Sequence, residues 1–91
     1  MPAYTVQLSK EALRFLEKQD KKTVNRIMAK IDEIANDPYA SNNNVNKLKG
    51  WPGYRLRVGN IRVLYELRDA VLVVAVMKIG FRGSVYQGKL I

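Results

Sequence analysis

Three arginines occupy alternate and facing positions in one short stretch of the sequence, and guanidinium groups arranged in this way could bind phosphate. Arg55 and Arg57 alternate with apolar residues, which is the pattern of a half-buried strand. Gly59-Asn60 predicts a two-residue turn, with glycine supplying the positive φ at its first position. A turn of that length pairs Arg57 with Arg62 on one face of a hairpin.

Such an arrangement has an energetic cost. Like charges directly opposite each other destabilise a strand pair by up to ~1 kcal/mol. A bound phosphate would offset this cost, because guanidinium forks match phosphate oxygens. A solvated sheet face that is charged only for solubility is the alternative, and we favour phosphate binding.

The distribution of charge along the chain supports this choice. The net charge is +8, and residues 1–46, with seven basic and six acidic side chains, contribute +1 of it. Residues 47–91 hold nine basic and two acidic side chains, a net of +7. An excess in one half indicates a surface that binds a polyanion, and general solubility is the alternative. Lys47 and Lys49 open this half and join Arg55 as candidate phosphate-binding residues.

Length and composition limit the classes of protein to consider. Ninety-one residues, 47% of them hydrophobic, suffice for one domain, 1–91, with a single core. No apolar run approaches the roughly 20 residues of a membrane span, and the first residues do not resemble a signal peptide. Without cysteine there is no disulfide framework or thiolate metal site. We therefore expect a cytoplasmic protein with no membrane association, no metal and no other cofactor.

Periodicity predicts the elements that must position the arginines. Alternation predicts a strand at 3–8, and two amphipathic helices should follow, capped by Ser9 and Asp20, with the second ending before Pro38. The asparagine-rich segment 39–46 is predicted to be a surface loop, followed by a connector over 47–53. In that connector, Trp51 should pack on the edge of the core, with stacking on a nucleic-acid base as the alternative.

The second half should form an antiparallel meander. Its predicted strands are 54–58, 61–68 and 71–79, with a tight turn at Asp69-Ala70, a break at Gly80 and a brief further strand around Val85. The last long strand is apolar on both faces, as expected of a central strand. The fold class is therefore α+β: an N-terminal strand, a helical hairpin and a meander of three or more strands, with the helices packed on one sheet face.

The segment NKLKGWPGYRLRVGNIRVLYEL, followed by the apolar strand and GFRGSVY, resembles the RelE/ParE superfamily of bacterial and archaeal toxins. The resemblance covers almost the whole chain. Its RelE branch implies a ribosome-dependent endoribonuclease that cuts mRNA in the ribosomal A site and forms a hetero-oligomer with a RelB-like antitoxin. Its ParE branch implies an inhibitor of DNA gyrase that is not an enzyme. A nucleic-acid-binding module without toxicity is a third possibility, which depends on the basic half alone.

The resemblance also implies a set of site residues. The functional basic positions of the RelE branch match Arg55, Arg57, Arg62 and Arg82, and its C-terminal tyrosine matches Tyr86. On this basis the expected catalytic residues are Arg57, Arg62, Arg82 and Tyr86, while Arg55, Lys47 and Lys49 would bind RNA phosphates.

The chemistry open to these residues is restricted. Many relatives carry histidine where this chain has Phe81, and the chain contains no histidine at all. Arginine stays protonated, so it cannot serve as a base, but it can stabilise the charge of a phosphorane. Tyr86 is then the candidate general base, provided that nearby cations lower its pKa, or it stacks on a base and orients the RNA.

Overall fold

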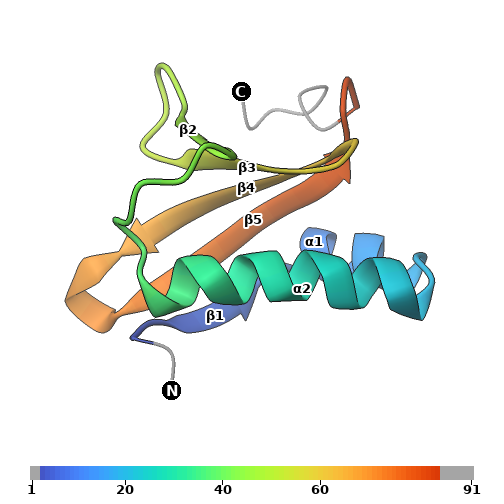
Figure 1. Ribbon diagram of the computed structural model, residues 1–91, viewed down its shortest axis with the longest axis horizontal. Coiled ribbons are helices and arrows are strands. Elements are labelled where there is room, and N and C mark those ends of the chain that lie inside the picture. The colour runs from blue at the N-terminus through green and yellow to red at the C-terminus, as the bar shows by residue number, and fades with distance from the viewer. Residues whose placement is uncertain (1–2, 85–91) are drawn as a thin grey trace.

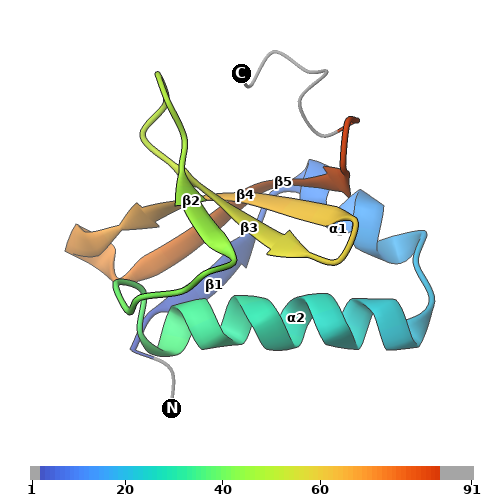
Figure 2. The ribbon, with the colours of Figure 1, turned by 45° about the horizontal axis from the view of Figure 1, so that its top comes forward.

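The computed structural model describes residues 3–84, which form two helices and a five-stranded sheet (Figure 1). The elements in chain order are β1 (Thr5–Leu8), α1 (Lys10–Glu17), α2 (Lys21–Asn36), β2 (Val45–Lys47), β3 (Tyr54–Val58), β4 (Ile61–Arg68), a 3₁₀ turn (Asp69–Val71) and β5 (Val73–Phe81). The strand order across the sheet is β1-β5-β4-β3-β2. The predicted α+β class, with the helices on one face of the sheet, is confirmed (Figure 2).

Both predicted helix caps are present. The Ser9 hydroxyl oxygen accepts a hydrogen bond from the Ala12 amide at 3.0 Å and donates one to the Met77 carbonyl at 2.6 Å. Asp20 accepts from the Thr23 amide at 2.9 Å. Each cap satisfies an amide that the first helical turn leaves without a partner. In the described part of the chain, neither helix is long and apolar enough to cross a lipid bilayer.

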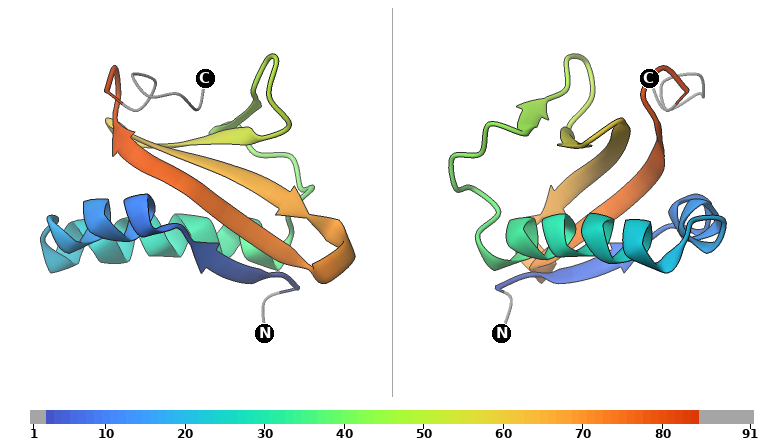
Figure 3. Two further views of the ribbon diagram at one scale, coloured as in Figure 1. Left: turned by 180° about the vertical axis from the view of Figure 1, so that it is seen from behind. Right: turned by 45° about the vertical axis from the view of Figure 1, so that its right-hand side comes forward.

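The core lies between the helices and the sheet. The two helices lie on the same side of the sheet (Figure 3). Isoleucines spaced along α2 are buried against alternate residues of β3, β4 and β5, and α1 adds a small and a large apolar side chain. The fully buried side chains of this layer include Ile27, Ile31, Leu56, Val63, Tyr65, Val74 and Val76. Because residues on a strand alternate between faces, the residues between these core positions point away from the helices.

The prediction of a loop over residues 39–46 was wrong at its end. Val45–Lys47 forms the edge strand β2, which pairs antiparallel with β3 and places Val45 opposite Leu56. The reason is tertiary: Val45 packs against the core, and the Arg57 amide donates to the Asn44 carbonyl at 2.8 Å. The sequence of this segment has little of the pattern of a strand, so its strand conformation depends on pairing with β3.

The predicted end of the last strand at Gly80 was also wrong. Gly80 is buried and paired with Arg62, and β5 continues to Phe81. The Phe81 ring makes an edge contact with Phe15 of α1, with 5.3 Å between centroids, which holds this end of the strand in place. The brief strand predicted around Val85 lies outside the described residues.

The start of the last strand differs from the prediction as well. The predicted tight turn is a 3₁₀ turn over Asp69–Val71, followed by Leu72 in the left-handed region with φ of 55°. The strand therefore begins at Val73 instead of at residue 71. It is an interior strand buried on both faces, as predicted, and β1 pairs parallel to its first half.

A carboxylate joins three segments at the β4–β5 end of the sheet. Asp69 accepts hydrogen bonds from the Tyr4 hydroxyl at 2.7 Å and from the Tyr39 hydroxyl at 2.6 Å. These two bonds lower the pKa of Asp69, and the bond to Asp69 is the main cause that raises the pKa of Tyr39 to about 12. The residue before β1, the segment after α2 and the turn before β5 are thereby linked.

This linkage predicts pH-dependent stability. A lowered folded-state pKa means that Asp69 stabilises the fold above its ordinary pKa of 3.8, and that this contribution is lost as the pH falls through the lowered value. Asp69→Asn should therefore reduce the free energy of unfolding at neutral pH and have a much smaller effect in acid well below pH 3.8. Urea unfolding of both proteins at the two pH values measures this. An equal difference at both values would contradict the assignment.

Candidate functional site

A pocket of about 320 Å³ opens on the sheet face that points away from the helices. Four arginines and two asparagines line it: Asn43, Asn46, Arg55, Arg57, Arg62 and Arg82. They come from the loop before β2, from β2, β3 and β4, and from the residue after β5. Segments far apart in the sequence therefore contribute to one concave surface.

The hairpin of β3 and β4 forms the floor of this pocket. Val58 pairs with Ile61 and Arg57 with Arg62, which confirms the predicted register. Gly59 has φ of 60°, the left-handed conformation that the two-residue turn requires. The facing arginines therefore lie on one face, while their neighbours in sequence are buried in the core.

Backbone carbonyls of the turn hold Arg62. Its Nη1 donates to the Gly59 carbonyl oxygen at 2.8 Å and to the Ile61 carbonyl oxygen at 3.1 Å. Arg62 is half-buried. These contacts fix one corner of the guanidinium group, so its position is largely set before any ligand arrives.

Arg57 is exposed, but an asparagine holds it. Its Nε and Nη2 both donate to the Asn44 side-chain oxygen, at 3.3 and 3.1 Å. The Asn44 amide in turn donates to the Asn42 side-chain oxygen at 2.9 Å. Asn44 is therefore a positioning residue for Arg57, and the hydrogen bond to Asn42 holds the loop that carries Asn44.

This contact predicts a modest effect on ligand binding. Asn44→Ala removes the acceptor that orients Arg57, and a hydrogen bond of this kind corresponds to about a 2- to 10-fold change in affinity. We expect pyrophosphate to bind that much more weakly to the variant and weaker still to Arg57→Ala, as measured by calorimetry. The matched control is Asn25→Ala, on the exposed side of α2. If Asn44→Ala bound pyrophosphate as the wild type does, Asn44 would have no positioning role.

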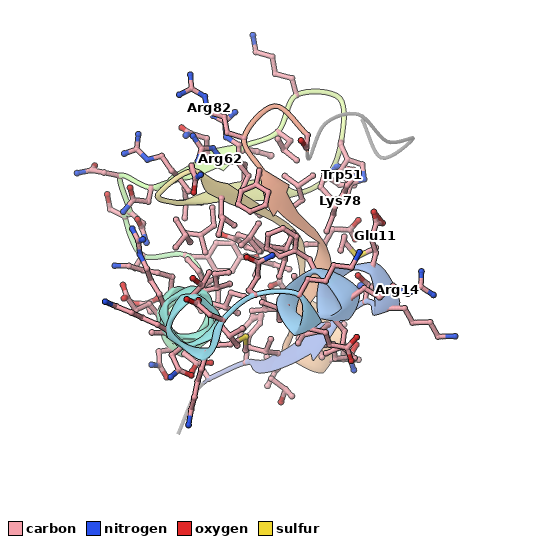
Figure 4. The ribbon with its side chains drawn as sticks, turned by 90° about the vertical axis from the view of Figure 1, so that its right-hand side faces the viewer. Glu11, Arg14, Trp51, Arg62, Lys78 and Arg82 are labelled. Atoms are coloured by element: carbon pink, nitrogen blue, oxygen red, sulfur yellow. The ribbon has the colours of Figure 1, made fainter. Side chains whose placement is uncertain are left out.

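Arg82 reaches the pocket from the end of β5. Its amide donates to the Asn60 carbonyl at 2.7 Å, which places it next to the β3–β4 turn. In Figure 4, the labelled Arg62 and Arg82 lie on the same side of the molecule, and Arg14 of α1 points away from them. The fold therefore brings a fourth cation to the three that the hairpin carries.

The other candidate residues are placed differently. Lys47 pairs with Tyr54, whose ring stacks on the core residue Tyr65, so Lys47 lies on the opposite face from the arginines. Lys49 is exposed in the turn after β2 and does not line the pocket. Tyr86 lies outside the described residues. The half-buried Trp51 lies over Gly53, where its ring occupies the space of a Cβ.

Asn43 and Asn46 are lining residues that sequence reasoning missed. The signal was the run of three asparagines that ends where β2 begins. Without β2 there was no reason to place that run beside the arginines. The β2–β3 register does so, because it sets Asn46 opposite Arg55.

The chemistry of the lining suits a phosphate ester. None of the six lining residues is acidic, so no carboxylate within the lining neutralises the four guanidinium groups. Each guanidinium can only donate hydrogen bonds and stays charged. Donors that are held in place, as those of Arg57 and Arg62 are, can stabilise negative charge that develops on phosphate oxygens without rearranging.

Comparison with known proteins identifies the family of this chain. Residues 6–86 match the family described as the ParE toxin of the type II toxin–antitoxin system parDE. A protein of Escherichia coli described as RelE-like toxin is 25% identical over 79 residues, which cover 87% of this chain and 83% of that protein.

Solved structures of toxins have the same fold. RelE in the RelE–RelB complex of Pyrococcus horikoshii OT3 superimposes with a TM-score of 0.77 at 27% identity, covering 90% of this chain and 98% of that chain. Isolated RelE of Escherichia coli superimposes with a TM-score of 0.75 at 25% identity, covering 88% and 85%. The family match extends over nearly the whole chain, from β1 to beyond β5. This protein is therefore a member of the ParE toxin family, a toxin of type II toxin–antitoxin systems within the RelE/ParE superfamily.

Proposed function

We propose that this toxin is a ribosome-dependent endoribonuclease that cleaves mRNA in the A site and thereby inhibits translation in the cytoplasm. The observation that carries the proposal is the convergence of four arginines on one pocket. A protein inhibitor that acts by surface contact alone has no need of such a pocket. A site that cleaves a phosphodiester does need such a pocket, because the transition state of the cleavage gains negative charge.

The proposed reaction uses the RNA's own 2′-hydroxyl. Its oxygen loses its proton and attacks the adjacent phosphorus, the bond from phosphorus to the 5′-oxygen breaks, and that oxygen takes up a proton from water, so the products are a 2′,3′-cyclic phosphate and a 5′-hydroxyl. Arg62 and Arg82 would stabilise the charge on the phosphorane, with Arg57 beside them. Arg55, which is two residues from Arg57 on β3 and farther from the turn, would bind a neighbouring phosphate. The assignment of Tyr86 as the base that accepts the 2′-proton stays a prediction.

The composition of the chain supports the proposed dependence on the ribosome. It has no histidine, so the commonest acid and base of nucleases is missing. Positioning alone can lower a barrier considerably when the attacking oxygen is held in line with the leaving group. In this proposal the ribosome holds the mRNA in that geometry, and the arginines supply the electrostatic stabilisation.

An antitoxin is the partner that we propose for neutralisation. The similar structures from Pyrococcus horikoshii and Escherichia coli include complexes of RelE with RelB. For this chain, an acidic or amphipathic segment of a RelB-like antitoxin would cover the cationic pocket or pack against the helices, giving a hetero-oligomer. Either mode would keep mRNA away from the arginines.

A direct test uses purified protein, ribosomes and a defined mRNA. Primer extension should show cuts within the A-site codon when the mRNA is bound to ribosomes, and far fewer on the same mRNA alone. Equal cutting of free and ribosome-bound mRNA would contradict ribosome dependence. The absence of cuts in both samples would contradict the nuclease function.

The second candidate function is inhibition of DNA gyrase without nuclease activity. It is favoured by the description of the matching family as a ParE toxin. A supercoiling assay with the same protein preparation separates the two candidates. Inhibited supercoiling together with intact ribosome-bound mRNA would establish this candidate and overturn the first.

A further inference from the structure

The two asparagines of the pocket, Asn43 and Asn46, differ from the nearby Asn42 and Asn44. The Asn42 and Asn44 side-chain oxygens already accept hydrogen bonds, from a backbone amide and from Arg57. Asn43 and Asn46 are exposed in the pocket, and within residues 3–84 their carboxamides have no hydrogen-bond partner. Their hydrogen-bonding capacity is therefore available to a ligand.

That capacity is of a kind that the arginines lack. A guanidinium group only donates hydrogen bonds, whereas a carboxamide both donates and accepts them. Binding of a phosphate uses donors only, so a site for an inorganic anion gains little from an acceptor. A nucleobase presents donors and acceptors together on its edges. The lining therefore suits a ligand with a phosphate and a base.

The fold keeps these two kinds of group side by side. Asn46 lies on β2 opposite Arg55, and Asn43 precedes Asn44, which is hydrogen-bonded to Arg57. Each asparagine is thus close in the fold to one of the β3 arginines. The volume of about 320 Å³ is at the lower end of the range for small-molecule sites, which fits one nucleotide and not a duplex.

We infer that Asn43 and Asn46 recognise the base of the nucleotide whose phosphates the arginines hold, and that they favour adenine. A carboxamide forms two hydrogen bonds with N6 and N7 of adenine, the pairing that asparagine makes in nucleic-acid recognition. The inference rests on the proposed function, because it names the nucleotide that the same pocket would read. It makes the two asparagines determinants of where the mRNA is cut.

Calorimetry with small probes tests the inference without ribosomes. The probes are the four nucleoside 3′,5′-bisphosphates, the base-free ribose bisphosphate and pyrophosphate. Wild-type protein should bind adenosine 3′,5′-bisphosphate at least about 5-fold more tightly than the base-free compound. The double variant Asn43→Ala/Asn46→Ala should bind both equally while keeping its affinity for pyrophosphate, and Asn25→Ala on α2 should behave as the wild type.

The outcomes separate this inference from the proposed function. If the wild type prefers adenine and the double variant does not, the inference is supported. This holds even if ribosome-bound mRNA stays intact, and in that case only the proposed nuclease function fails. Equal affinity of the wild type for all five bisphosphates overturns the inference even if mRNA is cut. Undetectable binding of every bisphosphate at millimolar concentration, or a base preference unchanged in the double variant, overturns it as well.

Discussion

Replacing Arg62 and Arg82 together with alanine is expected to lower the rate of cleavage of ribosome-bound mRNA by about 1000-fold or more. Removing one preorganised donor from a developing oxyanion typically costs about 100- to 1000-fold in rate. The two arginines stabilise the same phosphorane, so their effects should not simply multiply. Single-turnover measurement with saturating toxin isolates the chemical step from binding.

The control for this variant removes the same amount of charge elsewhere. Arg14 and Arg68 are exposed and do not line the pocket, so Arg14→Ala/Arg68→Ala also lowers the net charge from +8 to +6. We expect it to cut ribosome-bound mRNA within a few-fold of the wild-type rate. Equal losses in the two double variants would show that overall charge matters and that the pocket does not.

Leu56→Ala is expected to lower the free energy of unfolding by about 2–5 kcal/mol. Leu56 is 1% exposed and lies in the core between the sheet and α2. The loss combines buried apolar surface with the cavity that remains. A small domain has a total stability of about 5–15 kcal/mol, so this variant should lie close to the limit of folding. Urea denaturation measures the difference.

Leu13 supplies the matched control because it is the same residue type at 47% exposure on α1. Leu13→Ala should change stability by less than about 1 kcal/mol.

Leu56 also lies between Arg55 and Arg57 in β3, but its side chain is in the core whereas theirs line the pocket on the other face of the sheet. Under conditions where Leu56→Ala is folded, it should bind pyrophosphate nearly as tightly as the wild type, and a loss of binding in the folded variant would contradict this separation of core and site.

The elements with strong periodicity were predictable from the sequence. The spacing of Ile27, Ile31 and Ile34 specifies which face of α2 is buried, and alternation around Gly59-Asn60 specifies that Arg57 faces Arg62. Both patterns are local consequences of burying one face of a helix or a strand. The floor of the pocket was therefore available from the sequence alone.

The rest of the pocket depends on contacts between distant segments. Val45 is a single apolar residue in a polar run, so only its pairing opposite Leu56 makes β2 a strand and brings the asparagines to the arginines. Likewise, the position of Lys47 on the opposite face follows from a register that no local pattern specifies. Gly80 is a turn signal in isolation, yet its pairing with Arg62 keeps it in a strand.

The parallel pairing of β1 with β5 connects folding to protein synthesis. Thr5 pairs with Val73, so β1 is made well before β5, the strand with which it forms its hydrogen bonds. Contacts between residues so far apart in the sequence form slowly, because closing the long loop between them costs entropy before any hydrogen bond can offset that cost. A nascent chain that lacks residues 73–81 has no partner for β1 and an open edge on β4. The arginine pocket, which also needs Arg82, can therefore be assembled only when the chain has emerged from the ribosome as far as that residue.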